Sequence, residues 1–454
     1  MRVAIIGSGP TGMFLGAALA RRGHRVTAVD RDAGPEVGGR WRRRGVMQFH
    51  HAHAFRKQVI AALQAELPEA YEGWLAAGAE PIRLRRPGGD EVLLGVRSRR
   101  ETFERALRTV AARQSGLELR HGRVDAVLVS DGRARGVSVG GQELPADLVI
   151  DASGRSGRVT RGLRPSPVLS GDTGLAYVDR QYQLHAGAEP GPLMNPIAWQ
   201  ADLDGYQVVL FPHERGIFSV LIVRPTNEPD LVQLRHRAAF EAVCHAIPGL
   251  ATWTDPERSR PITDVLAGGA LVNHYCGQTG HDGALALPGL VFVGDAVCTT
   301  TPTFGRGVTT SLLQARELLR LLTEHGADVV TVGESFDAWC DTHMRPWVED
   351  HIRMDEAARR YWAGEDIDLA QRIPSNLIMA AAQVDKEIER GLGPYLAMEA
   401  GPSHLDAVEP RARAVYASGW RPSPDPGPTR HELIELVRAA APRSPTGMTL
   451  VQCG

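Results

Sequence analysis

The sequence predicts an α/β protein in which a parallel sheet is interrupted by an antiparallel sheet and followed by a helical carboxyl-terminal region. Three observations support this fold class. The chain opens with an apolar strand, a glycine-rich turn and a helix in immediate succession. Residues 165–265 carry several runs in which apolar and polar residues alternate, as in half-buried strands. A second apolar strand with its own glycine-rich turn follows at residues 290–307.

The first predicted element is a strand–helix–strand unit. Val3–Ile6 reads as a strand, residues 12–22 as a helix that Gly23 ends, and Arg25–Val29 as a second strand that ends at Asp30. This order is typical of a Rossmann-like dinucleotide-binding unit, and disfavours a glycine-rich turn without a ligand. It also explains the apolar start of the chain better than a secretory signal peptide does.

The turn of this unit, GSGPTG, has glycines with separate physical tasks. Gly7 permits a tight turn, Gly9 lets backbone N–H groups approach a pyrophosphate, and Gly12 lets the helix pack closely on the strand. The helix start presents unpaired N–H groups and a positive dipole end to the phosphates. Asp30 is placed to accept hydrogen bonds from a ribose.

The downstream motif reads LVFVGDAVCTTTPTFGRG over residues 290–307. Leu290–Val293 is a predicted strand, and Asp295 at its carboxyl end is well placed to bind polyol hydroxyls. A turn with Pro302, Gly305 and Gly307 then leads into a helix from Val308. The start of that helix would face a ligand carbonyl that becomes negative on reduction.

In this order the two motifs resemble the FAD-dependent monooxygenase superfamily, which has the glutathione-reductase-type FAD fold. The resemblance covers most of residues 1–360. It implies that Asp295 contacts the ribityl chain, that Arg100 lies near the FAD ribose and phosphates, and that Val124, after the strand Leu117–Arg120, touches the adenine. The implied cofactor-binding residues are Gly7, Gly9, Pro10, Thr11, Gly12, Asp30, Arg31, Arg100, Val124, Asp295, Pro302, Gly305, Gly307 and Val308.

A third block, DLVIDASGRSGR at residues 147–158, departs from the aromatic hydroxylases of this superfamily. Those enzymes carry an Asp-Gly pair that serves both FAD and NADPH, whereas this chain has Ser153-Gly154. The block is more similar to the branch of styrene and indole monooxygenases, polyether epoxidases, flavin halogenases and isoprenoid-saturating reductases. The resemblance therefore implies weak direct use of NADPH and a separate NAD(P)H flavin reductase as partner.

The stretch GVMQFHHAHAF at residues 45–55 resembles a GVxQxxHxH segment of the epoxidase-like branch. In a strand, His51 and His53 would share one face and His50 would lie on the other. A metal site needs three or four ligands, and no suitable cluster lies nearby in sequence, so no metal is expected. Three interpretations remain: structural histidines, a polar wall beside the flavin, or a substrate contact. In the second, one imidazole would donate a proton to a flavin–oxygen adduct. The flavin-side candidates are His51, His53 and Phe304; no catalytic residue is assigned.

The rest of the chain divides by composition and pattern. Five aromatic side chains are candidates to line a ligand-side face of the antiparallel sheet, although core packing is the commoner role: Tyr177, Tyr182, Trp199, Phe211 and Phe218. Residues 333–362 are predicted to be helical, and Thr429 with Glu432 forms a capping box for a helix to Ala441.

These patterns predict a Rossmann-like FAD-binding domain with an inserted antiparallel β-sheet substrate domain and a C-terminal helical region. The predicted parts are residues 1–164 (with 41–96 contributing to the substrate side), 165–265, 266–330 returning to the FAD-binding domain, 331–420, and 421–454 as Pro-rich linker and terminal helix.

Composition excludes several classes of protein. The formal net charge of −2 offers no field to attract nucleic acid or an anionic membrane, and no run of 18 apolar residues exists. The five cysteines are odd in number and form no CxxC pair, which disfavours a disulfide framework or a zinc ribbon. A reducing, cytoplasmic location is therefore expected.

The predicted function is that of an FAD-dependent monooxygenase. By resemblance, it would transfer one oxygen from a flavin C4a-hydroperoxide to an electron-rich alkene or aromatic small molecule, in specialised metabolism. An FAD-dependent C=C reductase of the isoprenoid-saturating type and a non-catalytic flavin-binding protein are the alternatives. A flavin halogenase is disfavoured, because such enzymes use an active-site lysine and W-x-W-x-I, whereas Lys57 is the only lysine before residue 386 and no W-x-W occurs.

Overall fold

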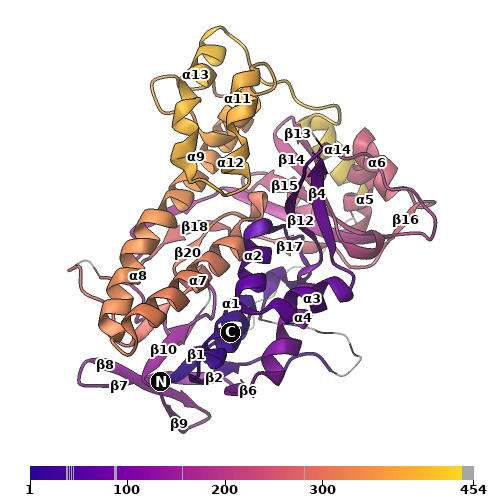
Figure 1. Cartoon of the computed structure of the whole chain (residues 1–454). Coiled ribbons are helices and arrows are strands. Elements are labelled where there is room, and N and C mark those ends of the chain that lie inside the picture. Colours follow the sequence, from indigo (N-terminus) through magenta and orange to yellow (C-terminus); the bar gives the residue numbers. More distant parts are fainter. Residues whose placement is uncertain are drawn as a thin grey trace, which may run out of the picture.

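The computed structural model describes residues 1–36, 39, 41, 43, 45–85, 89–155, 157–280 and 282–441. Ser156 of the third sequence block, Cys453 and the last part of the predicted segment 421–454 lie outside these residues. Figure 1 shows a lower part built on a parallel sheet, an antiparallel sheet beside it, and a helical region above. Within the described residues, no helix is both long enough and apolar enough to cross a membrane.

The parallel sheet has five strands in the order β19–β10–β1–β2–β6. The strands are β19 (Leu290–Phe292), β10 (Leu148–Asp151), β1 (Arg2–Ile6), β2 (Arg25–Asp30) and β6 (Leu117–His121). Helix α1 (Pro10–Arg21) connects β1 to β2 and packs against α4 (Arg100–Arg113) and α7 (Gly307–His325). The four strands predicted from sequence and the first helix are confirmed to within two residues, because their apolar residues are almost completely buried.

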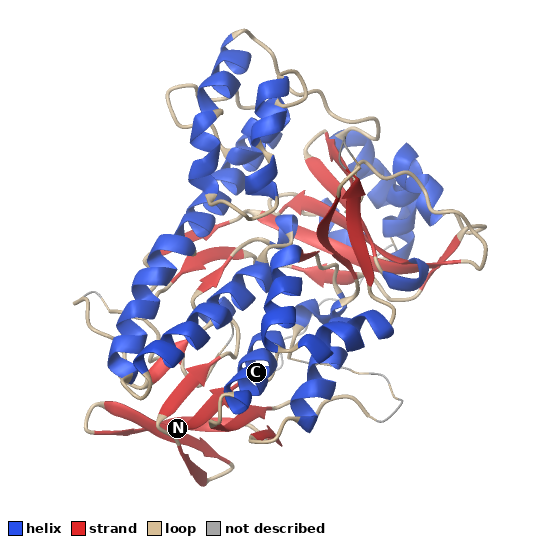
Figure 2. Ribbon diagram, viewed as in Figure 1, coloured by secondary structure: helices blue, strands red, loops and turns tan. Residues whose placement is uncertain are grey.

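A meander of β7 (Val124–Ser130), β8 (Arg133–Val139) and β9 (Gln142–Pro145) lies between β6 and β10 in sequence. A second small sheet joins β3 (Phe55–Arg56), β5 (Glu91–Arg97) and β4 (Glu80–Arg85). Helices α2 (Lys57–Glu66) and α3 (Pro68–Ala76) lie between β3 and β4 in the sequence. Figure 2 shows that the meander lies beside the N-terminus, at the amino end of the parallel sheet, whereas the β3–β5–β4 sheet lies on the side of the antiparallel sheet.

The antiparallel sheet has the order β13–β14–β15–β12–β16, with β17 also paired to β12. Its strands are β12 (Leu175–Leu184), β13 (Trp199–Leu203), β14 (Tyr206–Pro212), β15 (Ile217–Pro225), β16 (Ser259–Pro261) and β17 (Leu266–Gly268). One face packs on α5 (Arg237–Ala246) and α6 (Pro248–Thr254). The other face carries a smaller apolar cluster that includes Tyr177, Leu221 and Leu271.

A third small sheet differs from the predicted organisation. Strand β11 (Leu169–Asp172) falls within the segment predicted as the substrate sheet, but it pairs with β18 (Val272–Tyr275), which in turn pairs with β20 (Cys298–Thr299). The inserted sheet therefore begins in the structure at β12 and includes β17, just beyond residue 265.

The carboxyl-terminal region is helical. The segment predicted as helical over 333–362 lies within α8 (Val329–His343) and α9 (Arg345–Trp362), which meet at Met344. Four further helices share a core with α9 and are, in order, α10 (Ser375–Ala381), α11 (Lys386–Gly391), α12 (Gly393–Leu396) and α13 (Glu409–Ala417).

Helix α14 (Arg430–Ala440) follows the Pro-rich stretch, and its capping box of Thr429 and Glu432 is confirmed. The helix does not stand apart. Its Leu433 and Val437 are fully buried in the core that α5 shares with the antiparallel sheet.

Candidate functional site

One cavity of about 560 Å³ connects the two sheets. Its lining begins at the carboxyl ends of β1, β2, β10 and β19, passes the start of α7, and reaches Tyr177 of β12 and Leu221 of β15. Because parallel strands meet at this edge, it is where open α/β sheets bind ligands. Thirteen of the fourteen predicted cofactor residues line this cavity, and Gly12 lies behind it.

The glycine turn has the geometry that the sequence predicts. Gly7 has a φ of +98°, which favours glycine. A Cβ on Gly12 would lie 1.9 Å from the carbonyl oxygen of Gly7, so the helix and strand pack too closely for any side chain. A Cβ on Gly9 would meet no protein atom within 4 Å. Gly9, Pro10 and Thr11 line the cavity, so the start of α1 is open to a phosphate.

Asp30 lies at the end of β2 and is part of a buried ionic network. Its carboxylate accepts hydrogen bonds from the Ser8 backbone N–H at 2.8 Å and from the Arg43 guanidinium at 2.9 Å. Burial opposes the charge of Arg43, but Glu104 and Asp30 together raise its pKa above the ordinary value. Arg43 lines the cavity and was not predicted from sequence, where it is one of several arginines around Trp41.

Arg100 is the first residue of α4. Its Nε donates to Glu104 at 2.5 Å, and its Nη1 lies 3.4 Å from His53 Nε2. Arg31 also lines the cavity and donates to the Gly45 carbonyl. Val124 lies at the start of β7, beside Gly122 and Arg123 in the lining. These residues form the side of the cavity that continues from Asp30.

Asp295 follows β19, and its side chain lines the cavity. Burial raises the pKa of this carboxyl, and the positive charges of Arg100, Arg155 and Arg164 partly offset that rise. Among the described residues, no protein group donates a hydrogen bond to the carboxylate. A half-buried acceptor of this kind matches the hydroxyl groups of a bound polyol chain.

The second glycine turn places the start of α7 against the cavity. Gly305 has a φ of +59°, and a Cβ there would approach the Ala54 side chain to 2.7 Å. Pro302, Gly305, Gly307 and Val308 all line the cavity. Helix α7 begins at Gly307, one residue before the predicted start.

The histidines do not lie in a strand, so the alternation of faces that a strand would give them does not apply. Residues Met47–His50 form a 3-10 helix, and strand pairing begins only at Phe55. In this turn the Phe49 ring is buried and lies 5.1 Å from the Trp41 ring. His51 and His53 nevertheless both line the cavity.

His53 has both ring nitrogens engaged. Its Nδ1 lies 2.9 Å from the His51 carbonyl oxygen, to which it donates, and its Nε2 faces Arg100. Burial and the nearby Arg100 charge hold the pKa of His53 well below its ordinary value of 6.5. His53 is therefore a neutral link between the histidine segment and α4.

His51 is buried and lies beside a carboxylate that the sequence did not suggest. Its Nδ1 is 3.4 Å from Oδ2 of Asp179 on β12, and the Ala52 backbone N–H donates to the same oxygen at 2.7 Å. Burial raises the pKa of Asp179, although His51 and two backbone N–H groups oppose that rise. The His51 ring also packs edge-on against Tyr177 at 5.1 Å.

Other aromatic candidates lie elsewhere. Of the five on the antiparallel sheet, only Tyr177 lines the cavity. Tyr182, Trp199 and Phe218 face the α5 side, and Phe211 belongs to the cluster behind Tyr177. Phe304 is not among the lining residues; its ring packs edge-on against His351 at 5.7 Å and under the Arg306 guanidinium.

The third sequence block lies at the end of β10. Ser153 turns toward Asp151, to which its hydroxyl donates at 2.5 Å and its backbone N–H at 2.9 Å. Asp151 is buried and also pairs with Arg164 at 2.7 Å. Ser153 thus offers the cavity no carboxylate at the position of the hydroxylase Asp-Gly pair.

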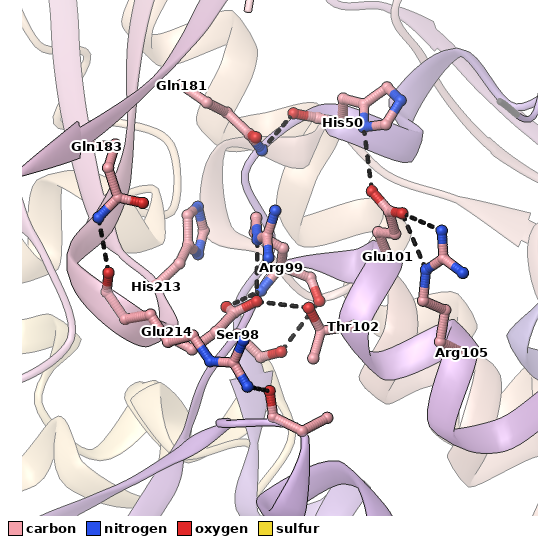
Figure 3. A network of polar contacts seen from close by, with 12 residues as sticks. His50, Ser98, Arg99, Glu101, Thr102, Arg105, Gln181, Gln183, His213 and Glu214 are labelled. Carbon is pink, nitrogen blue, oxygen red and sulfur yellow. Dashed lines mark hydrogen bonds and ion pairs between the residues drawn. The ribbon is translucent and has the colours of Figure 1, made fainter. Parts of the chain in front are cut away.

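A buried carboxylate joins the antiparallel sheet to the start of α4. Figure 3 shows Glu214, from the turn between β14 and β15, between Arg99 and Thr102. It accepts from the Arg99 backbone N–H at 2.7 Å, the Arg99 Nε at 2.9 Å and the Thr102 hydroxyl at 2.5 Å. Burial alone would raise the pKa of Glu214, but Arg99 and Thr102 hold it below its ordinary value.

A second buried network supports the threonine loop of the cavity from α9. The Thr301 hydroxyl lies 2.8 Å from His351 Nδ1 and 3.3 Å from Asp355, and Asn273 donates to Asp355 at 2.6 Å. Burial raises the pKa of Asp355 to about 7.

Because the folded state prefers protonated Asp355, we expect its stabilising contribution to be lost as the pH rises through about 7. Asp355→Asn should keep the acceptor oxygen for Asn273 but flatten the melting temperature between roughly pH 5 and pH 8. Melting curves of both proteins across this range test the effect. Asp366→Asn, at a side chain 74% exposed, is the control; identical pH profiles for Asp355→Asn and the unsubstituted protein would contradict the expectation.

We expect no stoichiometric zinc, iron or copper in protein purified without an affinity tag. His53 has both ring nitrogens occupied, and within the described residues no group of three or more His, Cys, Asp or Glu lies together to hold a metal. Elemental analysis of the unsubstituted protein and of His51→Ala tests this. A metal that is present at one per chain and disappears with His51→Ala would show the expectation to be wrong.

The elements around this cavity define a class: an α/β fold of the dinucleotide-binding type whose cavity extends to an antiparallel sheet. Residues 2–159 match the family model of the FAD dependent oxidoreductases. A segment of 94 residues is 31% identical to D-amino acid dehydrogenase 2 of Ralstonia nicotianae, and it spans only 20% of that protein and 21% of this chain.

Solved structures extend the comparison to the whole fold. The flavin-dependent brominase Bmp2 superposes with a TM-score of 0.64 at 15% identity, over 92% of this chain and 100% of the brominase. PqsL, a probable FAD-dependent monooxygenase from Pseudomonas aeruginosa, gives 0.57 at 17% identity, over 80% and 98%. The flavin-dependent halogenase CmlS gives 0.58 at 19% identity, over 96% and 76%.

The amino-terminal part of the chain, residues 2–159, is therefore similar to the FAD dependent oxidoreductases, and this match indicates FAD as the cofactor. The residues present fit that group. The absent Cβ at Gly9 leaves the start of α1 open, Asp30 and Arg43 would face the ribose, and the Asp295 carboxylate would accept hydrogen bonds from the polyol hydroxyls.

Proposed function

We propose that the protein is an FAD-dependent monooxygenase acting on an electron-rich, largely apolar small molecule, an alkene or an aromatic ring. The observation that supports this most is the continuous cavity, which passes from the nucleotide loop to an apolar wall on the antiparallel sheet. When bound and reduced, FAD supplies the activation of O₂. The protein holds the cofactor, excludes water and positions the substrate.

The chain's own residues account for those tasks. Gly9, Asp30 and Arg100 would hold the dinucleotide, and Asp295 would hold the polyol chain. Tyr177, Leu221 and Leu271 form the apolar wall, and each is at least nine-tenths buried. Such a wall keeps water from the reacting atoms, which protects a reactive oxygen species from hydrolysis.

The halogenase alternative is disfavoured by the position of Lys57. This lysine begins α2, forms an ion pair with Glu399 and is not among the residues that line the cavity. Among the described residues, the lining of the cavity contains no lysine. The likeness to Bmp2 and CmlS is a likeness of fold. A C=C reductase is distinguished from a monooxygenase by how the reduced FAD-loaded protein reacts with O₂.

The decisive experiment reduces the FAD-loaded protein anaerobically and mixes it with O₂ while the absorbance is recorded. A slowly decaying spectrum, distinct from those of reduced and oxidised protein, supports a monooxygenase. Immediate return of the oxidised spectrum with one H₂O₂ per flavin contradicts it. Leu271→Asn should shorten the lifetime of the slow phase by admitting water, whereas Leu396→Asn, at a side chain 41% exposed and outside the lining, should not.

We expect NADPH alone to reduce the bound FAD slowly or not at all. Ser153 takes the position of the hydroxylase Asp and is turned toward Asp151, so the carboxylate that serves NADPH is missing. Stopped-flow absorbance with NADPH, with and without an added flavin reductase, measures this. Rapid reduction by NADPH in the absence of the reductase would refute the proposal of a separate reductase partner.

A further inference from the structure

His51 and Asp179 are two buried polar groups that have little else to bind. The side chain of His51 is 3% exposed and that of Asp179 is 0% exposed. Within the described residues, His51 Nδ1 and Asp179 Oδ1 are buried without a hydrogen bond, and Nδ1 lies 3.4 Å from Oδ2 of the same carboxylate. Polar groups are costly to bury unpaired, so a pair formed by Asp179 of β12 and the neighbouring His51 calls for an explanation.

The His51 ring is oriented between Asp179 and the cavity. Asp179 is held by the Ala52 backbone N–H at 2.7 Å, so the carboxylate is fixed behind the imidazole. The opposite nitrogen, Nε2, has no hydrogen-bond partner among the described residues, and His51 lines the cavity. A carboxylate behind one nitrogen keeps the proton there and leaves a lone pair on the other. Distances near 3.4 Å are common for such pairs before a ligand binds.

The neighbouring histidine does not have this freedom. His53 Nδ1 donates to the His51 carbonyl, and its Nε2 accepts from Arg100. His50 lies outside the lining. Of the three histidines in the segment, His51 is therefore the one with a nitrogen available to a molecule in the cavity. Around it lie the Tyr177 ring, Leu221 and Leu271, which suit a flat apolar ligand.

We infer that His51 is a catalytic residue that accepts a proton from a hydroxyl or ring N–H of an aromatic substrate, and that Asp179 is the residue that positions it. The O–H or N–H bond breaks, its electron pair stays on the substrate, and the proton bonds to Nε2. The resulting imidazolium faces the Asp179 carboxylate through Nδ1–H. The electron pair left on the substrate enriches the ring, which favours attack by an electrophilic oxygen. This inference rests on the proposed function. It narrows the proposed substrate class to aromatic rings that carry a hydroxyl or N–H hydrogen-bond donor.

The test measures the reactivity of His51 toward diethyl pyrocarbonate in the oxidised, FAD-loaded protein. The reagent modifies an unprotonated imidazole nitrogen, and peptide mass spectrometry reports each histidine separately. We expect rapid modification of His51 and protection of His53. In Asp179→Asn the amide donates to Nδ1 and moves the proton to Nε2, so modification of His51 should slow by about tenfold or more. His431, whose side chain is 80% exposed, should react equally in both proteins. A His51 that does not react, or reacts at the same rate in the variant, overturns the inference.

A second measurement needs no substitution. Phenol should protect His51 in the unsubstituted protein, whereas anisole, which has the same ring without the donor, should not. Equal protection by both compounds, or by neither, overturns the assignment of a donor-bearing substrate. Because neither experiment involves O₂ or flavin reduction, their failure is distinguishable from failure of the proposed monooxygenase activity.

Discussion

Gly12→Ala is expected to yield protein that no longer retains FAD and that unfolds at a clearly lower temperature. The added Cβ would lie 1.9 Å from the Gly7 carbonyl oxygen, which is backbone and has no flexible end to move. The start of α1 must then separate from β1, at a cost of about 3 kcal/mol or more, the upper range for overpacking. Separation also removes the turn that presents N–H groups to the pyrophosphate.

Gly9→Ala is the matched variant, because its Cβ would meet no protein atom within 4 Å but would project where the pyrophosphate must approach. The protein without FAD should keep its stability to within about 1 kcal/mol. FAD affinity should fall about tenfold or more, which corresponds to ~1.4 kcal/mol. Thermal unfolding without FAD and fluorescence titration with FAD separate the two effects. A Gly12→Ala protein as stable as Gly9→Ala would contradict the close packing described here.

The second large effect is expected for Glu214→Ala. This carboxylate is fully buried and receives three hydrogen bonds at the start of α4, so its removal leaves Arg99 and Thr102 unpaired at a domain contact. We expect a loss of about 3 kcal/mol in the free energy of unfolding, the lower end for breaking a buried pair. The loss is expected at the lower end of that range because the Arg99 side chain is 27% exposed, so water can hydrate its guanidinium once the carboxylate is removed.

Glu101→Ala, on the same helix, is the control. Its carboxylate is 20% exposed and pairs with Arg105 one turn away, so the loss should stay below about 1 kcal/mol. Urea unfolding of both variants measures the difference. Since the pKa of Glu214 is lowered, its contribution is present above the ordinary value of 4.5 and is lost as the pH falls below it. Equal losses in the free energy of unfolding for Glu214→Ala and Glu101→Ala would contradict the expectation that Glu214 stabilises the contact between the antiparallel sheet and α4.

The local parts of the fold were predictable from sequence. The glycine spacing, the paired apolar strands and the Thr429–Glu432 capping box each depend on residues a few positions apart, and each lies in the structure where the sequence places it. The 3-10 turn at Met47–His50 was not predictable from the sequence, because it accompanies the packing of the Phe49 ring against Trp41, a contact that no periodic pattern records.

The site residues divide in the same way. Asp30 and Asp295 follow strands at fixed distances from glycine motifs, so pattern alone identified them. Arg43 and Asp179 act through partners more than ten residues away in the chain, which no local pattern records. One signal was present for Asp179: a carboxylate in the otherwise apolar start of the LAYVDRQYQL strand must find a partner when it is buried.

Because α14 packs into the core of the inserted sheet, that core can be completed only late in the synthesis of the chain. Strands β12 to β15 are complete by residue 225, yet the apolar surface that Leu433 and Val437 cover stays open until nearly the whole chain has emerged. During that interval of synthesis the nascent domain exposes an apolar surface of the kind that chaperones bind. Shortened versions that stop after α13 should therefore aggregate, even though they retain every residue of the cavity.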